Sequence, residues 1–189
     1  MKSKGILSLL LAMAVTMMQL PLHASAETGA EAVSVTLGDD YAENGMSAWS
    51  GDSGSVTKVS YDGQSAWQTN PDDGPRYIYF NVGDSYINGG TNPVNVTIEY
   101  YDGPAAGNSF VFSYDSAWNA WDYDVPKTVL TGSNTWKTVT FALSDAQFAN
   151  RENGADIRID TTGPVAFRSL TVEKSAEASV PASIRRTLR

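Results

Sequence analysis

Short stretches in which apolar residues occupy every second position run through this sequence and predict β-strands. In residues 77–82 the apolar set is Ile78, Phe80 and Val82, and residues 94–101 repeat the alternation. Successive side chains of a strand point to opposite faces, so each stretch has one apolar face that must be buried. Further strand candidates are residues 33–37, 56–61, 65–69, 109–114, 136–143, 155–160 and 165–173.

Glycine, proline, asparagine and aspartate cluster between these stretches, as β-turns require. The turn candidates are residues 61–63, 73–75, 88–90, 102–104, 131–134 and 162–164. About nine strands in roughly 145 residues indicate one domain. The predicted fold class is all-β, an antiparallel two-sheet β-sandwich of the jelly-roll type. Residues 144–150 are the single stretch expected to form a helical turn, with Ser144 as its cap and Phe148 facing inward.

The first 26 residues have the features of a secretory signal peptide. Lys2 and Lys4 form a basic start, residues 6–22 are mostly apolar, and residues 24–26 read Ala-Ser-Ala, a small-residue cleavage site. An uncleaved membrane anchor is the alternative, but polar residues and a proline interrupt the apolar run, which is short for a membrane span. We expect a signal peptide over residues 1–26 and a secreted, extracellular protein.

The predicted β-sandwich occupies residues 27–174, and the composition changes after it. Residues 175–189 begin like a linker and end in a short basic segment, so they are predicted to be a linker or disordered tail. Two accounts stay open: a small secreted protein with a frayed end, and the amino-terminal module of a longer polypeptide.

Signal cleavage would remove much catalytic chemistry from the mature chain. His23 is the only histidine, and the sequence has no cysteine. A Ser-His-Asp triad, a thiolate nucleophile and the usual zinc site of nitrogen and sulfur ligands are therefore excluded. Carboxylate, tyrosine, lysine and arginine chemistry remain, together with oxygen-ligated metals such as calcium.

The mature chain is acidic. Loss of Lys2 and Lys4 from 13 basic residues, against 21 acidic ones, leaves about ten net negative charges. This charge disfavours a nucleic acid or an anionic membrane as partner. It fits a neutral polysaccharide better than an acidic one, although charge also simply keeps a secreted protein soluble.

One segment, residues 112–126, combines two tryptophans and two tyrosines with three aspartates, a composition that complete burial does not allow. Flat rings beside carboxylates suit a sugar, whose apolar face stacks on a ring while its hydroxyls bond to acids and amides. The candidate stacking residues are Trp118, Trp121 and Tyr123, and the candidate hydrogen-bonding residues are Asp115, Asn119, Asp122 and Asp124. Packing at the end of the sandwich is the alternative for either tryptophan.

For three further aromatic residues the sequence predicts different degrees of burial. Tyr114 continues the alternation of residues 109–112, which favours burial. Trp136 is expected in core or rim packing, because it opens a strand whose apolar set lies on the opposite face. Trp49, in a glycine-rich stretch, is a second candidate for an exposed platform.

Clustered carboxylates suggest a structural calcium site. If the ends of the sandwich meet, the candidate ligands are Asp39, Asp40, Glu43, Asp156 and Asp160. Turns also require aspartate beside glycine and asparagine, so a purely structural role is the alternative.

Residues 77–90, 94–102, 135–143, 148–151 and 156–160 resemble jelly-roll, galactose-binding-like carbohydrate modules. Such modules accompany the catalytic domains of secreted bacterial glycoside hydrolases and polysaccharide lyases. The resemblance implies this fold, binding of a polysaccharide or oligosaccharide, a covalently attached catalytic domain in many cases, and often a structural calcium. It carries over no sugar-binding motif residue by residue.

The function expected is that of a non-catalytic carbohydrate-binding module that targets an enzyme or a surface to a polysaccharide. No catalytic residue is assigned. Catalysis is the second class considered, because Asp115 with Asp122 or Asp124 could form a glycosidase carboxylate pair, and tyrosine with lysine or arginine serves some lyases. A structural or adhesive envelope protein with no glycan affinity is the third.

Overall fold

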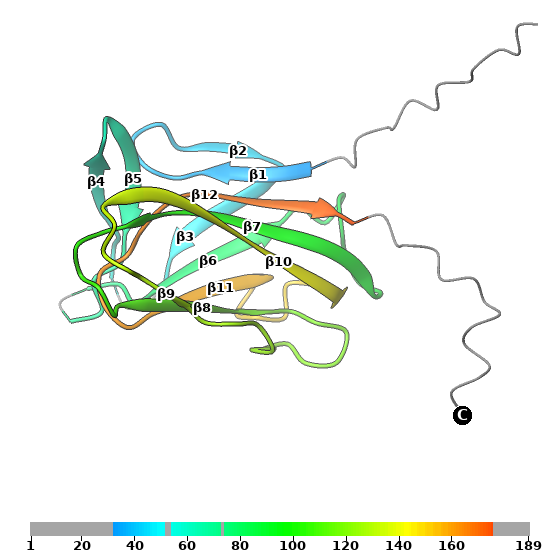
Figure 1. Ribbon diagram of the computed structural model, residues 1–189. Coiled ribbons are helices and arrows are strands. Elements are labelled where there is room, and N and C mark those ends of the chain that lie inside the picture. Colours follow the sequence, from blue (N-terminus) through cyan, green and yellow to red (C-terminus); the bar gives the residue numbers. More distant parts are fainter. Residues whose placement is uncertain (1–31, 52–53, 73, 176–189) are drawn as a thin grey trace, which may run out of the picture.

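Two antiparallel β-sheets packed face to face make up the computed structural model, which describes residues 32–51, 54–72 and 74–175 (Figure 1). The seven-stranded sheet contains β1 (Ala32–Thr36), β2 (Ala42–Asn44), β4 (Thr57–Tyr61), β5 (Gln64–Gln68), β7 (Asn92–Asp102), β10 (Thr135–Ala146) and β12 (Ala166–Lys174). The five-stranded sheet contains β3 (Met46–Ser50), β6 (Tyr77–Val82), β8 (Ser109–Tyr114), β9 (Thr128–Val129) and β11 (Ile157–Thr161).

The strand order establishes the predicted jelly-roll sandwich. The large sheet runs β10-β7-β12-β1-β2, with the β4–β5 hairpin joined through β12, and the small sheet runs β3-β6-β11-β8-β9. Strands next to each other in the sequence therefore often lie in different sheets, and the first and last described strands, β1 and β12, pair side by side. The predicted signal peptide and nearly all of the predicted tail lie outside the described residues. Within those residues, no helix has the length and apolar character needed to cross a membrane.

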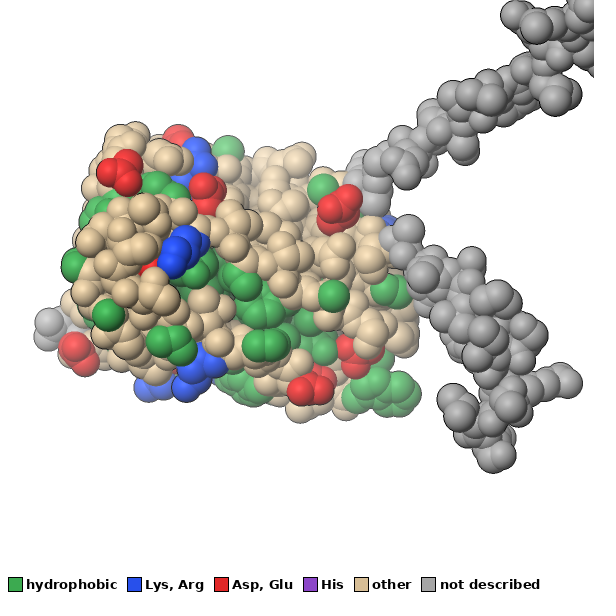
Figure 2. All heavy atoms as spheres, in the orientation of Figure 1, with side chains coloured by type: hydrophobic (Ala, Val, Ile, Leu, Met, Phe, Trp, Pro, Cys, Tyr) green, Lys and Arg blue, Asp and Glu red, His purple; other side chains and the backbone are tan. Residues whose placement is uncertain are grey.

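The core lies between the sheets and is built by the alternation that the sequence shows. In β7 every second residue from Val94 to Tyr100 is buried, and its neighbours are only partly covered. Ten apolar residues at alternating strand positions pack in it, Val139 being partly buried and the others buried: Ile78, Phe80, Val82, Val96, Ile98, Phe110, Phe112, Val139, Phe141 and Ile157. Figure 2 shows a strip of hydrophobic side chains on the side of the sandwich between the sheet edges.

The structure departs from the predicted elements in two ways. The short strands β2, β3 and β9 were not predicted: β2 and β9 have only three and two residues, and β3 has no alternation of large apolar residues with polar ones. The helical turn expected at residues 144–150 is wrong, since β10 continues to Ala146 and the chain then turns through Phe148 with φ of +46°. Phe148 is nevertheless fully buried, as predicted.

The β4–β5 hairpin stands against the outer surface of the large sheet through an aromatic cluster. The rings of Tyr61 and Tyr101 stack with centroids 4.1 Å apart, and the ring of Trp136 meets Tyr101 edge-on at 5.3 Å. The Trp136 indole N–H donates to the Tyr61 carbonyl at 3.1 Å. Trp136 thus packs at the sheet rim as expected, and its contacts hold the hairpin against β7 and β10.

Replacement of Trp136 by alanine should destabilise the domain, because it removes both the ring contact and the hydrogen bond to the hairpin. We expect the free energy of unfolding to fall by about 2–4 kcal/mol, measured by urea denaturation. The matched control is Trp118→Ala: the Trp118 side chain is 82% exposed, so its loss should change stability by less than about 0.5 kcal/mol. Equal stabilities of the two variants would contradict the role given to Trp136.

Candidate functional site

The outer face of the five-stranded sheet carries aromatic and charged side chains where a solvent-facing sheet would ordinarily carry small polar ones. Strand register places Trp49 of β3 opposite Tyr79 of β6, Tyr79 opposite Arg158 of β11, and Arg158 opposite Ser113 of β8. We call this surface the sheet face. Because one face of each strand is committed to the core, all of these side chains project to the same side.

Arg158 lies at the centre of the sheet face between aromatic rings. Its guanidinium carbon is 4.5 Å from the ring centroids of both Tyr77 and Trp121 and 5.8 Å from that of Tyr123. The guanidinium donates to the hydroxyl of Tyr123, and the Tyr79 side chain hydrogen-bonds it as well. Cation–π attraction therefore draws the loop after β8, which contains Trp121 and Tyr123, onto the sheet.

Trp49 provides the open aromatic surface of the sheet face. Its ring stacks on that of Tyr79, with centroids 5.8 Å apart and planes 9° apart, and the side chain remains 37% exposed. Together with Ser50, Gly51 and Asn153 these rings line a hollow of about 430 Å³. A Cβ at Gly51 would lie only 2.6 Å from Tyr79 Cε2, so glycine there lets the chain approach the ring.

The wall of this hollow is the loop between β10 and β11, which two buried carboxylates hold in place. Asp115 accepts hydrogen bonds from the backbone N–H groups of Ala149 (2.8 Å) and Arg151 (3.1 Å), and it pairs with the Arg151 guanidinium at 2.6 Å. Asp156 accepts from the N–H groups of Asn150 (2.8 Å) and Val82 (2.9 Å). Backbone N–H groups of the loop are thereby hydrogen-bonded although the loop has no regular secondary structure.

Glu152 belongs to that loop, and its side chain is fully buried. Its Oε1 accepts from the Ser113 hydroxyl and lies 3.7 Å from Arg158 Nε, while Oε2 has no hydrogen-bond partner in the part of the chain described. Burial raises the pKa of Glu152 to about 7, and burial likewise raises the pKa of Asp156 to about 6. Both carboxyls are therefore partly protonated at mildly acidic pH.

The predicted stacking residues all belong to the loop after β8, but they differ in their surroundings. Trp121 and Tyr123 lie at Arg158, as described above, and Tyr123 is 44% exposed. Trp118 projects from the turn at the tip of the loop, where its backbone N–H donates to the Ser116 hydroxyl. Tyr114 is buried and donates its hydroxyl to Asp145, as a core-facing residue can.

Of the four predicted hydrogen-bonding residues, one is buried and structural and three are accessible to solvent. Asp115 has no exposed surface, and its carboxylate oxygens are bonded to the Arg151 guanidinium and to backbone N–H groups. It therefore has no free oxygen to bond a sugar hydroxyl, and it is excluded from an open glycosidase pair. Asn119 and Asp122 shape the loop, because each accepts a bond from the backbone N–H two residues ahead. Asp124 is exposed.

The five candidate calcium ligands do not come together. Asp39 pairs with Lys58, Asp40 accepts from the Ser65 hydroxyl, Glu43 accepts from the Tyr41 hydroxyl, Asp156 binds backbone N–H groups, and Asp160 pairs with Arg76. Each is thus engaged in its own local contact. The described residues contain no group of three or more acidic or histidine side chains placed to hold a metal ion. Binding of calcium stays a prediction of the sequence.

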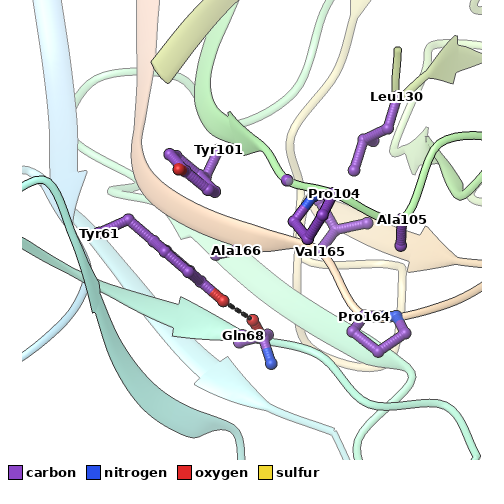
Figure 3. A pocket seen from close by; sticks show the side chains of 10 residues that line it. Tyr61, Gln68, Tyr101, Pro104, Ala105, Leu130, Pro164, Val165 and Ala166 are labelled. Carbon is purple, nitrogen blue, oxygen red and sulfur yellow. Dashed lines mark hydrogen bonds between the residues drawn. The ribbon is translucent and has the colours of Figure 1, made fainter. Parts of the chain in front are cut away.

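A second hollow, of about 160 Å³, lies beside the β4–β5 hairpin (Figure 3). Its wall is mostly apolar, including Pro104, Leu130 and Val165, and its polar feature is the bond from the Tyr61 hydroxyl to Gln68 Oε1 (2.9 Å). Among the described residues, no charged side chain lines it. The hollow at Trp49 is larger and more polar, so the sheet face is the stronger candidate site.

Sequence reasoning missed Arg158, Tyr77, Tyr79, Glu152 and Asn153 as site residues. A signal for the two tyrosines was present, since they occupy the polar positions of an alternating strand where aromatic rings are not required for the core. Glu152 and Asn153 gave no such signal, because only the folded loop brings them to the sheet.

Comparison with known proteins shows no family for this chain. No protein-family model matches the chain, and no curated protein matches it. Among solved structures, the xylan-binding CBM22-1 domain of Paenibacillus barcinonensis Xyn10C is 14% identical with a TM-score of 0.48, over 78% of this chain and 98% of that one. The K1 cleaved adhesin domain of Lys-gingipain from Porphyromonas gingivalis W83 is 9% identical, also at 0.48, over 77% and 99%.

The CBM29_1 carbohydrate-binding module of Piromyces equi is 13% identical with a TM-score of 0.42, over 82% of this chain and 98% of that one. Carbohydrate-binding modules are thus among the solved structures similar to this chain. At these identities and scores the likeness assigns no ligand to this chain.

The raised pKa values predict how stability varies with pH. Between about pH 4 and pH 7 the folded domain keeps protons that the unfolded chain has released, on Asp156 up to about pH 6 and on Glu152 up to about pH 7. The free energy of unfolding should therefore decrease as pH rises through this window, by up to about 1.4 kcal/mol per unit of pKa difference. Urea denaturation at several pH values measures this slope.

Glu152→Gln is the variant that tests the assignment, because the amide keeps the shape and the bond from Ser113 but cannot ionise. Its slope between pH 4.5 and pH 7 should be shallower than that of the wild type. The control, Asp124→Asn, changes an exposed carboxylate and should keep the wild-type slope. Identical slopes for the wild type and Glu152→Gln would show that Glu152 does not titrate in this window.

Proposed function

We propose that this domain is a non-catalytic carbohydrate-binding module and that it holds a polysaccharide on the sheet face. The observation that carries the proposal is the exposed Trp49 ring. This ring stacks on Tyr79 and lines a hollow that also has polar groups at its edge. A sugar ring can stack on Trp49 while its hydroxyls bond to Asn153 and to the backbone of residues 50–51.

The loop after β8 would extend the same surface. Tyr123 and Trp118 have exposed rings, and Asn119, Asp122 and Asp124 offer acceptors and donors beside them. The loop is placed by the Arg158 contacts before any ligand arrives, so little ordering would be needed on binding. Trp121 and Tyr77 have a different role, because Arg158 covers a face of each ring; they position the surface.

The biological task proposed is attachment of an enzyme or a cell surface to a polysaccharide outside the cell. Export rests on the signal-peptide features of residues 1–26. A single shallow site of this kind gives modest affinity, and several sites in one assembly would increase it through avidity. Linkage to a hydrolase or lyase domain is compatible with this role.

Trp49→Ala should weaken polysaccharide binding about tenfold, because one stacking contact and its buried area are lost. The measurement is affinity electrophoresis against soluble neutral and acidic polysaccharides, confirmed by calorimetry on those that retard the wild type. Trp118→Ala and Trp121→Ala should each weaken binding as well. Thermal melts of every variant check that the fold is intact.

Tyr61→Ala is the matched control, since Tyr61 is also a partly exposed ring stacked on a tyrosine, Tyr101, but it lies on the large sheet. It should bind like the wild type. If no polysaccharide retards the wild type, or if Trp49→Ala binds as the wild type does, the sheet face is not a glycan site and a structural or adhesive role takes its place.

A further inference from the structure

A small basic pocket lies on the sheet face in addition to the Trp49 hollow. It has a volume of about 180 Å³ and is lined by Arg76, Ser109, Phe110, Val111, Lys127, Asp160 and Thr162. Two of these residues are cations and one is an anion. The Arg76 guanidinium pairs with Asp160 at 2.7 Å, while Lys127 forms no ion pair within the described part of the chain. The pocket therefore carries one net positive charge.

This local charge is opposite in sign to that of the whole protein, whose formal net charge is −8. At physiological ionic strength, charges more than about 8 Å away in solvent are largely screened. The charged groups that an anion in the pocket would meet are Lys127 and the Arg76–Asp160 pair. The nearby loop carboxylates Asp122 and Asp124 do not line the pocket.

The pocket and the Trp49 hollow flank the same strand. Asp160 pairs in register with Tyr77, and the Gly51 N–H at the edge of the hollow donates to the Tyr77 carbonyl at 3.3 Å. Tyr77 and Tyr79 are adjacent on the sheet face, with ring centroids 6.4 Å apart. A ligand that stacks on Trp49 and continues across β6 and β11 is therefore directed toward the pocket, which Asp160 of β11 lines.

We propose that this basic pocket receives the carboxylate of a uronic acid, so that the domain prefers a polysaccharide bearing uronic acid residues to its neutral counterpart. The inference rests on the proposed function, because the glycan must lie across the sheet face. A carboxylate beside Lys127 forms a charge-assisted hydrogen bond. The Thr162 hydroxyl is hydrogen-bonded to Ser109, so Lys127 is the donor on which the proposal rests. The acidity of the sequence as a whole had favoured a neutral polysaccharide; the local charge reverses that expectation.

The test compares each acidic polysaccharide with its own carboxyl-reduced form, in which the uronic acid has become the neutral sugar and the backbone is unchanged. Glucuronoxylan and polygalacturonate are the two parent polymers, and affinity electrophoresis at 0.15 M salt is the measurement. Carboxyl reduction of the polymer that binds should weaken retention of the wild-type chain about tenfold.

Lys127→Met should remove this preference and bind both forms equally, whereas Lys58→Met, which removes an exposed lysine of the other sheet, should retain it. Equal binding of parent and reduced polymers by the wild type, or binding of neutral polysaccharides alone, would overturn the uronic acid preference and leave the glycan site standing. Absence of binding to every polymer, acidic or neutral, would overturn both proposals.

Discussion

The candidate site depends on two buried carboxylates, Asp115 and Asp156. They lie next to each other across β8 and β11, and they accept the backbone N–H groups of the irregular loop between β10 and β11. Without these bonds the loop would leave buried N–H groups unsatisfied, at a cost of about 1–3 kcal/mol each. The same loop contains Glu152, which accepts a hydrogen bond from the Ser113 hydroxyl, and Asn153, which lines the Trp49 hollow. Acidic residues that resemble ligand contacts in the sequence thus act as the support of the site.

Arg158 connects this support to the aromatic surface. It lies between the rings of Tyr77 and Trp121, bonds to Tyr123, and approaches the buried carboxylate of Glu152. An arginine suits this place because its planar guanidinium can stack on rings and donate in several directions at once. Its presence also divides the aromatic residues into those that position the surface and those, such as Trp49, whose outer face is open to a ligand.

Carboxylates also stabilise the domain elsewhere, which matters in a sequence that has no cysteine and hence no disulfide. Asp102, fully buried at the end of β7, accepts bonds from Thr131, Ser133 and the Lys137 ammonium. Burial alone would raise its pKa, but these bonds outweigh burial and hold the pKa below its usual range. Asp102 therefore stabilises the fold above its ordinary pKa, whereas Glu152 and Asp156 weaken it as the pH approaches neutrality.

The sequence alone determined the fold class, because period-two alternation commits one face of each long strand to the core and turn residues mark where the strands end. Residues such as Ile78 and Phe80 could be placed in the core for that reason, and Trp136 in a rim contact. The sequence also identified an aromatic segment after β8. Tertiary structure alone decided where the polar residues of the candidate site lie: Asp115 and Glu152 are buried, while Arg158, Glu152 and Lys127 come to one sheet from separate parts of the chain. The physical reason is that alternation reports which face of a strand is apolar, but not which strands become neighbours or which loop folds over them.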